Sequence, residues 1–402
     1  MTSARRPAGL SVQGRSMETR IPFLEVSDAI VMSGAETLYW CMQCGLCTGT
    51  CPWRLVPGEA SEQFNIRLVQ RMGQLGLEGF ESENCLFACT TCKACAVRCP
   101  RGVDIIANVR GMRSMLAEVG TIPPSLKPIA GSLHSQGNPW SGDRAKRIDW
   151  VKDADVPTFS ADTEYFLSVC CTSCYDVRSQ RIARSVAKAL KAAGVSFGII
   201  GNEESCCGES IRKVGDEALF QKLAQSNIEL YKSKGVKKII VTSPHCLYTF
   251  KTEYPELGGE FEVYHYTEIL NKAVAEGALK LSGDAAGPVA LHDPCYLGRH
   301  SEVYDAPRDL ISAIPGAELK ELARNRQNSL CCGGGGGRVW METKAGERFA
   351  ELRITEAVDA GAKTLVTACP YCITMLEDSC NVMGKADQLK VIDLSELIAE
   401  KV

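Results

Sequence analysis

Two groups of four cysteines in the first hundred residues have a spacing that could bind iron–sulfur clusters. In each group the spacing is C-x2-C-x2-C-x3-C-P, and the second group follows the first by 48 residues. In motifs of this kind three thiolates hold one [4Fe–4S] cubane, and the fourth, before proline, reaches the other. Zinc sites more often pair two C-x2-C hooks, so the spacing favours two cubanes over zinc. The predicted ligands are Cys41, Cys44, Cys47 and Cys99 for one cubane and Cys89, Cys92, Cys95 and Cys51 for the other.

A second cysteine pattern occurs twice in the C-terminal half of the chain. Each copy has one cysteine, then Cys-Cys-Gly, then a final cysteine, and corresponding cysteines lie 124 to 126 residues apart. An offset this uniform predicts two copies of one domain. The second copy is complete, and its candidate ligands are Cys295, Cys331, Cys332, Cys369 and Cys372.

The first copy departs from this pattern at Ser243, which stands where the second copy has Cys369. A serine oxygen is a poor substitute for a thiolate on iron. We expect a modified first site in which Cys174 supplies the replacement sulfur, with Cys170 as the other available thiol. A four-ligand cluster, a zinc ion and an empty site are the alternatives. The predicted residues of this modified site are Cys171, Cys206, Cys207, Cys246 and Cys174.

The elements that must position these cysteines change along the chain. Apolar residues in 33–118 recur every three to four positions, which predicts a helical ferredoxin-type domain. We expect 1–32 to be a flexible tail. Residues 119–160 are rich in proline, glycine and charge and are predicted to be a connector that docks through Trp140 and Trp150.

From about residue 161 short apolar segments alternate with amphipathic ones, which predicts a parallel sheet in each of two α/β domains, 161–280 and 281–402. The whole chain is therefore predicted to be α+β and multi-domain. The carboxyl ends of parallel strands share one rim, where helix N-termini can stabilise thiolate charge. Predicted strands are Tyr165–Val169, Phe197–Ile200, Lys238–Thr242, Val289–Leu291 and Lys363–Thr367, and predicted helices are Arg178–Ala193 and Asp216–Lys234.

The composition of the chain bears on its expected partners and its cellular compartment. The 402 residues carry a net charge of −3 and no dense Lys/Arg block, so nucleic acid is not an expected partner. We find no apolar run near the roughly 18 residues of a membrane span and no secretory signal. Twenty-one cysteines without an export signal indicate metal ligands in a reducing compartment, and we expect the cytoplasm. No G-x-G-x-x-G follows a strand, so we expect no flavin or NAD on this chain.

These motifs together resemble the catalytic subunit of heterodisulfide reductase and its relatives. The resemblance implies a noncubane [4Fe–4S] cluster held by five cysteines in each complete Cys-Cys-Gly domain, so one or two here, with a disulfide cleaved between the two clusters. It also implies flavoprotein or iron–sulfur partner subunits in a larger complex, electron-bifurcating in some relatives. The residues that carry it, besides the cubane motifs, are Cys171-Thr-Ser-Cys-Tyr-Asp, Glu204-Ser-Cys-Cys-Gly, Pro244-His-Cys, His292-Asp-Pro-Cys-Tyr-Leu-Gly-Arg, Cys331-Cys-Gly-Gly-Gly-Gly-Gly-Arg and Cys369-Pro-Tyr-Cys.

Several polar residues lie close to the predicted ligands in sequence. His245, His292 and His300 are candidates for delivering a proton to a thiolate leaving group, and hydrogen bonding that orients the cysteines is the alternative. Arg299 and Arg338 either neutralise cluster charge or bind a carboxylate, unless they are plain surface charges.

Four functions fit these observations. The first is an oxidoreductase subunit that passes electrons through the cubanes for disulfide reduction or onward transfer. The second is a non-catalytic electron-transfer subunit, for example of a CoA-ester reductase, which Ser243 favours. The third is a zinc-stapled scaffold. The fourth is the iron–sulfur subunit of a flavin-dependent 2-hydroxyacid or glycerol-phosphate dehydrogenase. Cys85 and Cys380 fall outside every motif and are expected to be free buried thiols.

Overall fold

The computed structural model describes residues 22–402 apart from 83–84, 153 and 285–286. Of the expected tail, residues 1–21 lie outside the described part. Leu24–Met32 forms helix α1, which packs on α4 (Ile66–Leu75) and α5 (Ile105–Glu118), so the prediction of a tail is wrong for this segment. The Phe23 amide donates to the Leu75 carbonyl at 2.9 Å and fixes where α1 begins.

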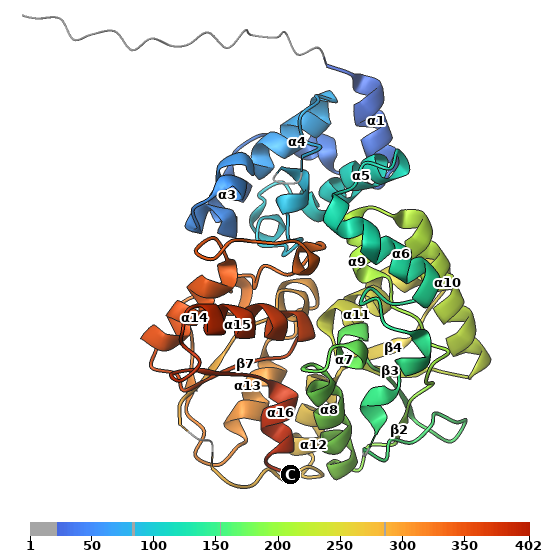
Figure 1. Ribbon diagram of the computed structural model, residues 1–402, viewed down its shortest axis with the longest axis vertical. Coiled ribbons are helices and arrows are strands. Elements are labelled where there is room, and N and C mark those ends of the chain that lie inside the picture. The colour runs from blue at the N-terminus through green and yellow to red at the C-terminus, as the bar shows by residue number, and fades with distance from the viewer. Residues whose placement is uncertain (1–21, 83–84, 153, 285–286) are drawn as a thin grey trace, which may run out of the picture.

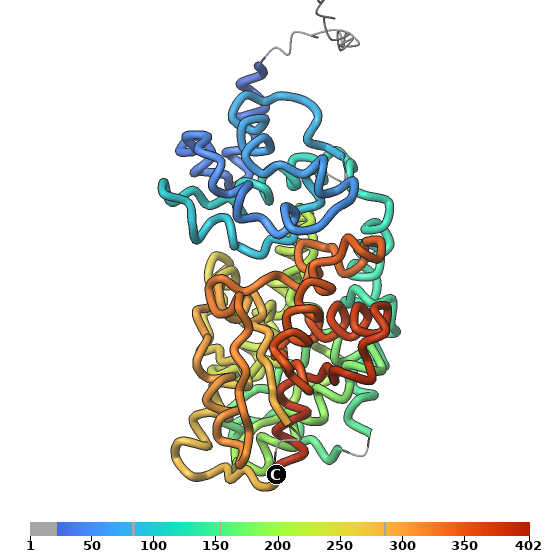
Figure 2. Tube along the Cα trace, turned by 90° about the vertical axis from the view of Figure 1, so that its left-hand side faces the viewer, coloured from blue at the N-terminus to red at the C-terminus, as the bar shows by residue number. Residues whose placement is uncertain are grey.

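The N-terminal module is helical, as its apolar period predicted. Asn65 and Asp104 cap α4 and α5 by accepting hydrogen bonds from amides of the first turn. Short helices lie between α1 and α4 and between α4 and α5, and Figures 1 and 2 show the module lying across one end of the two later domains. The short helices are η1 (Leu38–Trp40), α2 (Leu46–Thr50), η2 (Pro52–Leu55), α3 (Glu59–Gln63), η3 (Leu86–Ala88) and η4 (Ala96–Arg98).

The connector docks on both later domains. Trp150 is buried, and its carbonyl accepts a hydrogen bond from Arg184 at 2.8 Å. Trp140 meets Trp340 of the last domain with ring centroids 6.0 Å apart. The connector therefore holds the domains together. It contains η5 (Pro124–Leu126), α6 (Lys127–Gln136), η6 (Arg144–Lys146) and η7 (Asp149–Val151).

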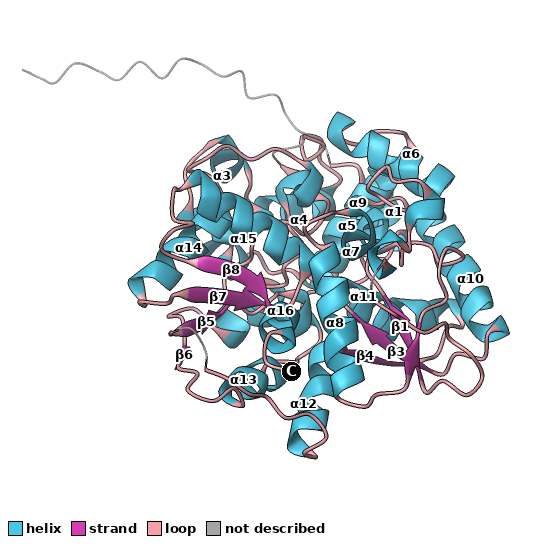
Figure 3. Cartoon of the chain, turned by 60° about the horizontal axis from the view of Figure 1, so that its bottom comes forward, coloured by secondary structure: helices cyan, strands magenta, loops and turns pink. Residues whose placement is uncertain are grey.

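Each α/β domain contains one four-stranded parallel sheet, and the two strand orders correspond. The orders are β2-β1-β3-β4 and β6-β5-β7-β8, and Figure 3 shows the two sheets as separate units. The predicted strands are present within one or two residues, but β4, β6 and β8 were not predicted. The strands are β1 (Tyr165–Ser168), β2 (Phe197–Gly198), β3 (Lys238–Val241), β4 (Glu262–His265), β5 (Val289–Leu291), β6 (Leu319–Lys320), β7 (Thr364–Thr367) and β8 (Lys390–Asp393).

The helices of the two domains pack on one another reciprocally. The last helix of the first domain, α12, packs on the first long helix of the second, α13, and α16 in turn packs on α8. Such an exchange is what two copies related by an approximate twofold axis produce. The helices are α7 (Cys171–Tyr175), α8 (Gln180–Ala192), α9 (Glu209–Val214), α10 (Glu217–Ser233), α11 (Pro244–Tyr248), α12 (Tyr266–Ala275), α13 (Asp305–Ser312), α14 (Phe349–Asp359), α15 (Pro370–Val382) and α16 (Leu394–Ala399), with η8 (Thr249–Glu253), η9 (Tyr254–Leu257), η10 (Tyr296–His300), η11 (Arg326–Asn328) and η12 (Arg338–Trp340).

Candidate functional site

The N-terminal module forms two cysteine-lined cavities, and the fourth cysteine of each motif crosses to the other cavity. One cavity, of about 380 Å³, is lined by four cysteines together with Arg67 and Arg101. The second, of about 330 Å³, is lined by the other four. The grouping is the one that the sequence predicted: Cys41, Cys44, Cys47 and Cys99 in the first cavity and Cys51, Cys89, Cys92 and Cys95 in the second.

The two cysteine loops share an unusual backbone. Gln43 and Gly45 in the first loop, and Thr91 and Lys93 at the same positions of the second, have φ angles of 62°, 84°, 51° and 64°. Left-handed residues let a short chain curl round a centre, and for the three that carry a side chain this costs roughly 1 kcal/mol each. A conformation repeated at that cost indicates that both loops are shaped around a ligand.

The chemistry of these cavities fits a metal cluster. Burial raises the pKa of the Cys51, Cys89 and Cys95 thiols, and neighbouring cysteines raise those of Cys51 and Cys95 further. Thiolates gathered in so small a space need a strongly bound cation to compensate their charge. Four sulfurs around each cavity match the ligand set of a [4Fe–4S] cubane.

In the second Cys-Cys-Gly domain the five predicted cysteines form a continuous series of neighbouring sulfurs. The side chains interact in the order Cys295, Cys331, Cys332, Cys372, Cys369, and all are buried. Burial opposes ionisation of Cys369, but hydrogen bonds from Cys372 and His245 lower its pKa to about 5. Five adjacent sulfurs, one of them ionised readily, form a site suited to iron.

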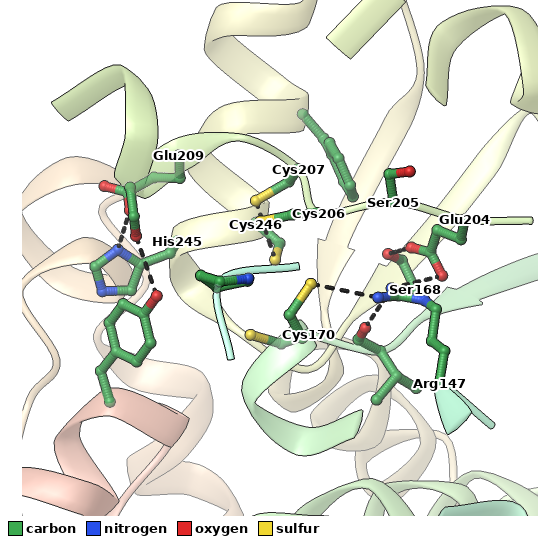
Figure 4. A pocket seen from close by; sticks show the side chains of 16 residues that line it. Arg147, Ser168, Cys170, Glu204, Ser205, Cys206, Cys207, Glu209, His245 and Cys246 are labelled. Carbon is green, nitrogen blue, oxygen red and sulfur yellow. Dashed lines mark hydrogen bonds and ion pairs between the residues drawn. The ribbon is translucent and has the colours of Figure 1, made fainter. Parts of the chain in front are cut away.

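In the first domain the structure assembles five cysteines, but not the five that were predicted. Cys170, rather than Cys174, joins Cys171, Cys206, Cys207 and Cys246 around a cavity of about 410 Å³ (Figure 4). Cys174 points away from this cavity, and its thiol lies 3.5 Å from the Val169 carbonyl. The prediction of Cys174 as the replacement sulfur is therefore wrong in geometry. Cys170 precedes helix α7 with an extended backbone, whereas Cys174 lies inside that helix, and the sequence spacing did not show which of the two faces the cavity.

A buried ion pair that the sequence did not suggest closes the first site. Arg147 of the connector contacts Glu204 at 3.0 Å, with both side chains almost fully buried, and its Nη1 donates to Cys171 Sγ at 3.3 Å. Glu204 also accepts hydrogen bonds from Ser168 and Tyr231. A permanent guanidinium beside a thiolate offsets part of its charge. Arg147 lies in a charged connector far from any motif, so only the fold reveals its place.

The second cavity of the module lies directly against the second Cys-Cys-Gly site. The Cys92 and Cys331 side chains interact, and Arg299 Nε donates to the Cys92 carbonyl at 2.7 Å. The glycine run, Gly333–Gly337, makes this approach possible. A Cβ on Gly335 would lie 2.3 Å from the Thr90 carbonyl oxygen, inside any van der Waals contact. The two ligand sets are therefore adjacent through their sulfurs.

Side chains from each domain reach across to the other at the junction between the two Cys-Cys-Gly sites. His245 Nδ1 lies 3.1 Å from Glu209, and the same ring is a hydrogen-bond partner of Cys369. Conversely, the Tyr371 hydroxyl lies 3.0 Å from that of Ser210. Burial opposes protonation of His245, but Glu209 and Cys369 raise its pKa well above its ordinary value. Glu209 was not singled out by the sequence.

The other two candidate histidines have different settings. His292 is fully buried, its Nδ1 accepts a hydrogen bond from Arg353 Nε at 3.1 Å, and its ligand atom lies within 4.8 Å of Cys332 and Cys372 sulfurs. His300 Nε2 lies 2.9 Å from the Thr91 carbonyl, so this ring supports the cysteine loop of the module. Both rings make hydrogen bonds that orient neighbouring groups, and proton delivery by either stays a prediction.

The remaining candidates are placed as follows. Arg299 and Arg338 are buried, so neither is a plain surface charge, and Arg338 lies over the Trp53 ring at 5.5 Å. Cys85 and Cys380 are buried thiols outside the four cysteine sets, as expected. Across the described residues, the structure has no helix with the length and apolar character of a membrane span.

Comparison with known protein families matches three segments of the chain. The 4Fe-4S dicluster domain matches residues 35–103. The cysteine-rich domain matches twice, at residues 168–251 and 289–377. These segments coincide with the module that contains the two cavities and with the two domains that contain five-sulfur sites.

Several curated proteins are similar over most of the chain. The probable iron-sulfur-binding oxidoreductase FadF of Bacillus subtilis is 40% identical over 80% of this chain and 47% of its own length. The EtfAB:quinone oxidoreductase of Syntrophomonas wolfei is 36% identical over 84% of this chain and 49% of its own. One subunit of the dihydromethanophenazine:CoB–CoM heterodisulfide reductase of Methanosarcina mazei is 32% identical over 90% of this chain and 93% of its own length. The chain thus spans about half the length of the first two relatives and nearly all of the third.

Proposed function

The chain belongs to the heterodisulfide-reductase-like iron–sulfur oxidoreductases, and from that premise we propose that it passes single electrons between a partner protein and its paired cysteine-rich sites. Bound clusters would supply the one-electron redox chemistry. The observation that carries the proposal is the contact between Cys92 and Cys331, which joins the cysteine set of the module to that of the second domain. His245 then joins the second set to the first through Cys369.

The order of the cysteine sets gives the proposed electron route an outer end in the module and an inner end at the Cys-Cys-Gly sites. Of the 21 cysteines, all within the described residues, only Cys44 is exposed. Tyr39, Trp40 and Met42 beside it are half exposed or more. An apolar surface around the one accessible ligand suits an electron-transfer partner. We propose that a flavoprotein or another iron–sulfur subunit binds there, because the sequence carries no dinucleotide fingerprint of its own. We propose the cytoplasm as the compartment of this complex.

The inner end of the route is the pair of Cys-Cys-Gly sites. His245, Tyr296 and Tyr371 are all buried between the two domains, with the His245 and Tyr296 rings stacked at 3.9 Å. A substrate disulfide lying between the sites would have to displace these rings. The packing therefore favours onward electron transfer as the principal activity.

Disulfide reduction is the second candidate, favoured by similarity that extends over 93% of the heterodisulfide reductase chain from Methanosarcina mazei. In that reaction a disulfide would take up two electrons and two protons and release two thiols. The two candidates are separated by supplying reduced, iron-loaded protein with a small heterodisulfide. Release of two thiols per disulfide supports the reductase, and reoxidation only by a redox protein supports the relay.

The route itself is tested with a cysteine of the second cavity. Cys95→Ala should slow reduction of the second-domain site at least tenfold when electrons are supplied by a reduced flavoprotein. The matched control is Cys85→Ala, which removes a buried thiol of the same module that lines neither cavity. Reduction of the second-domain site at the wild-type rate in Cys95→Ala would disprove the route.

A further inference from the structure

The sulfurs of the first Cys-Cys-Gly site follow the same order as those of the second. Cys171 interacts with Cys206, Cys206 with Cys207, and Cys207 with Cys246, whose sulfurs lie 3.6 Å apart. In the second domain the corresponding series ends at Cys369. In the first it ends at Cys170, which is the neighbour of Cys246.

Ser243 makes different contacts from Cys369, its counterpart in the second copy. Its side chain accepts a hydrogen bond from the His245 amide at 3.3 Å and caps helix α11, whereas Cys369 makes no such bond at the start of α15. Ser243 is also absent from the residues that line the 410 Å³ cavity. The hydroxyl is therefore committed to the backbone and does not contribute to the sulfur cavity.

Neighbouring strands explain how a ligand could change position. β1 and β3 pair in parallel, with Ser168 opposite Val241, so the residues that follow each strand lie side by side. The Cys170 amide donates to Thr242 Oγ1 at 3.0 Å. A sulfur placed at 170 can thus reach the region that a sulfur at 243 would occupy. At the position of Cys170 the second domain has Pro294, so each copy has one cysteine at this rim that the other lacks.

From this geometry we propose that Cys170 replaces the missing cysteine, and that the first domain binds its own iron–sulfur cluster through Cys170, Cys171, Cys206, Cys207 and Cys246. The inference rests on the proposed function, because it assumes that both domains work as redox sites. It also places the terminal sulfurs of the two copies near each other, since Cys170 and Cys369 interact electrostatically.

Metal content and spectroscopy test the assignment without relying on activity. Four clusters require about 16 irons per chain, and anaerobically prepared wild type should contain that number with matching acid-labile sulfide. Cys170→Ala should lose about a quarter of the iron, or change the EPR spectrum of the first site, identified as the signal other than those of the two module clusters that persists in Cys332→Ala. Cys174→Ala is the matched control and should keep both iron and spectrum.

Rescue distinguishes ligand loss from misfolding. The double variant Cys170→Ala/Ser243→Cys moves the sulfur to the position that it has in the second domain and should regain about 16 irons. An unchanged first-site spectrum in Cys170→Ala would overturn the inference, as would wild type with about 12 irons and zinc or no metal in the first site. Wild type with only about eight irons would reject the proposed function itself, since neither domain would then hold a cluster.

Discussion

Arg113 offers the most direct test of how the module is attached to the two cysteine-rich domains. The guanidinium is fully buried on α5 and donates to four backbone carbonyls, two within the module and two in the later domains. The partners in the later domains are Lys213 at 2.8 Å and Gly336 at 3.1 Å. One side chain therefore joins all three units, and Arg113→Met keeps its bulk while removing every donor.

The expected loss can be worked out from these contacts. All four carbonyls lose the Arg113 donor, but the Leu86 carbonyl keeps a hydrogen bond from the Cys89 amide, so three are left without a donor. A buried acceptor left without its donor costs about 1–3 kcal/mol. Removing a buried charge returns part of that, because burial already lowers the pKa of Arg113 to about 10. We expect a net loss of about 3–5 kcal/mol in the free energy of unfolding.

Unfolding of iron-loaded protein in denaturant, followed by cluster absorbance and by circular dichroism, measures this loss. In wild type the two signals should change together. In Arg113→Met cluster bleaching in the module should come first, at lower denaturant, because the module separates from its support. Arg110→Met, on a partly exposed face of the same helix, is the control and should change stability by less than about 1 kcal/mol. Coincident transitions in Arg113→Met at the wild-type midpoint would refute the role of Arg113 as the joint.

Three further predictions address other parts of the structure. Arg147→Met and Glu204→Gln should each destabilise the protein by about 3–5 kcal/mol, and the double variant should lose clearly less than the sum of the two. A double-mutant cycle in denaturant measures this difference, and additive losses would show that the two side chains are independent. Gly335→Ala should slow electron transfer from the module to the second domain in stopped-flow measurements, whereas Gly131→Ala, with open space at its Cβ, should leave the rate unchanged; equal rates in both would show that the close approach is unimportant. Burial raises the pKa of Asp393 to about 7, above its unfolded value, so wild type should lose stability relative to Asp393→Asn as pH rises from about 4 to about 7; a pH-independent difference in denaturant midpoints would contradict this.

Much of this architecture could be predicted because the chain repeats itself. The motif spacing groups the module's cysteines as the two cavities do, since the crossing of the fourth cysteine follows from that spacing. That each group holds a cluster stays a prediction. The uniform offset of the second pattern predicted two equivalent domains, and the sheets have matching orders. Strands such as Val289–Leu291 were found because a continuous apolar run is typical of a strand buried on both faces.

The failures have local causes. β6 spans only Leu319–Lys320, and β4 and β8 alternate with polar residues because they lie at sheet edges, so none forms an apolar run. Cys170 was ranked behind Cys174 because spacing does not show that Cys170 lies on extended backbone before a helix and Cys174 inside that helix. No sequence pattern indicated the buried position of Arg147, because its partner Glu204 lies 57 residues away and becomes a neighbour only when the connector folds back.

The asymmetry between the two copies follows from what surrounds each of them. The second site lies against the module, where the Cys92 and Cys331 side chains interact. The first site is closed by the connector, through Arg147 and through the Gly137 carbonyl that accepts from the Cys206 amide at 2.7 Å. The first site therefore has a guanidinium beside Cys171, whereas the second has a cysteine of the module beside Cys331. The same duplicated fold therefore has the complete five-cysteine pattern in the copy beside the module and the modified pattern, with Ser243 and Cys170, in the copy that the connector closes.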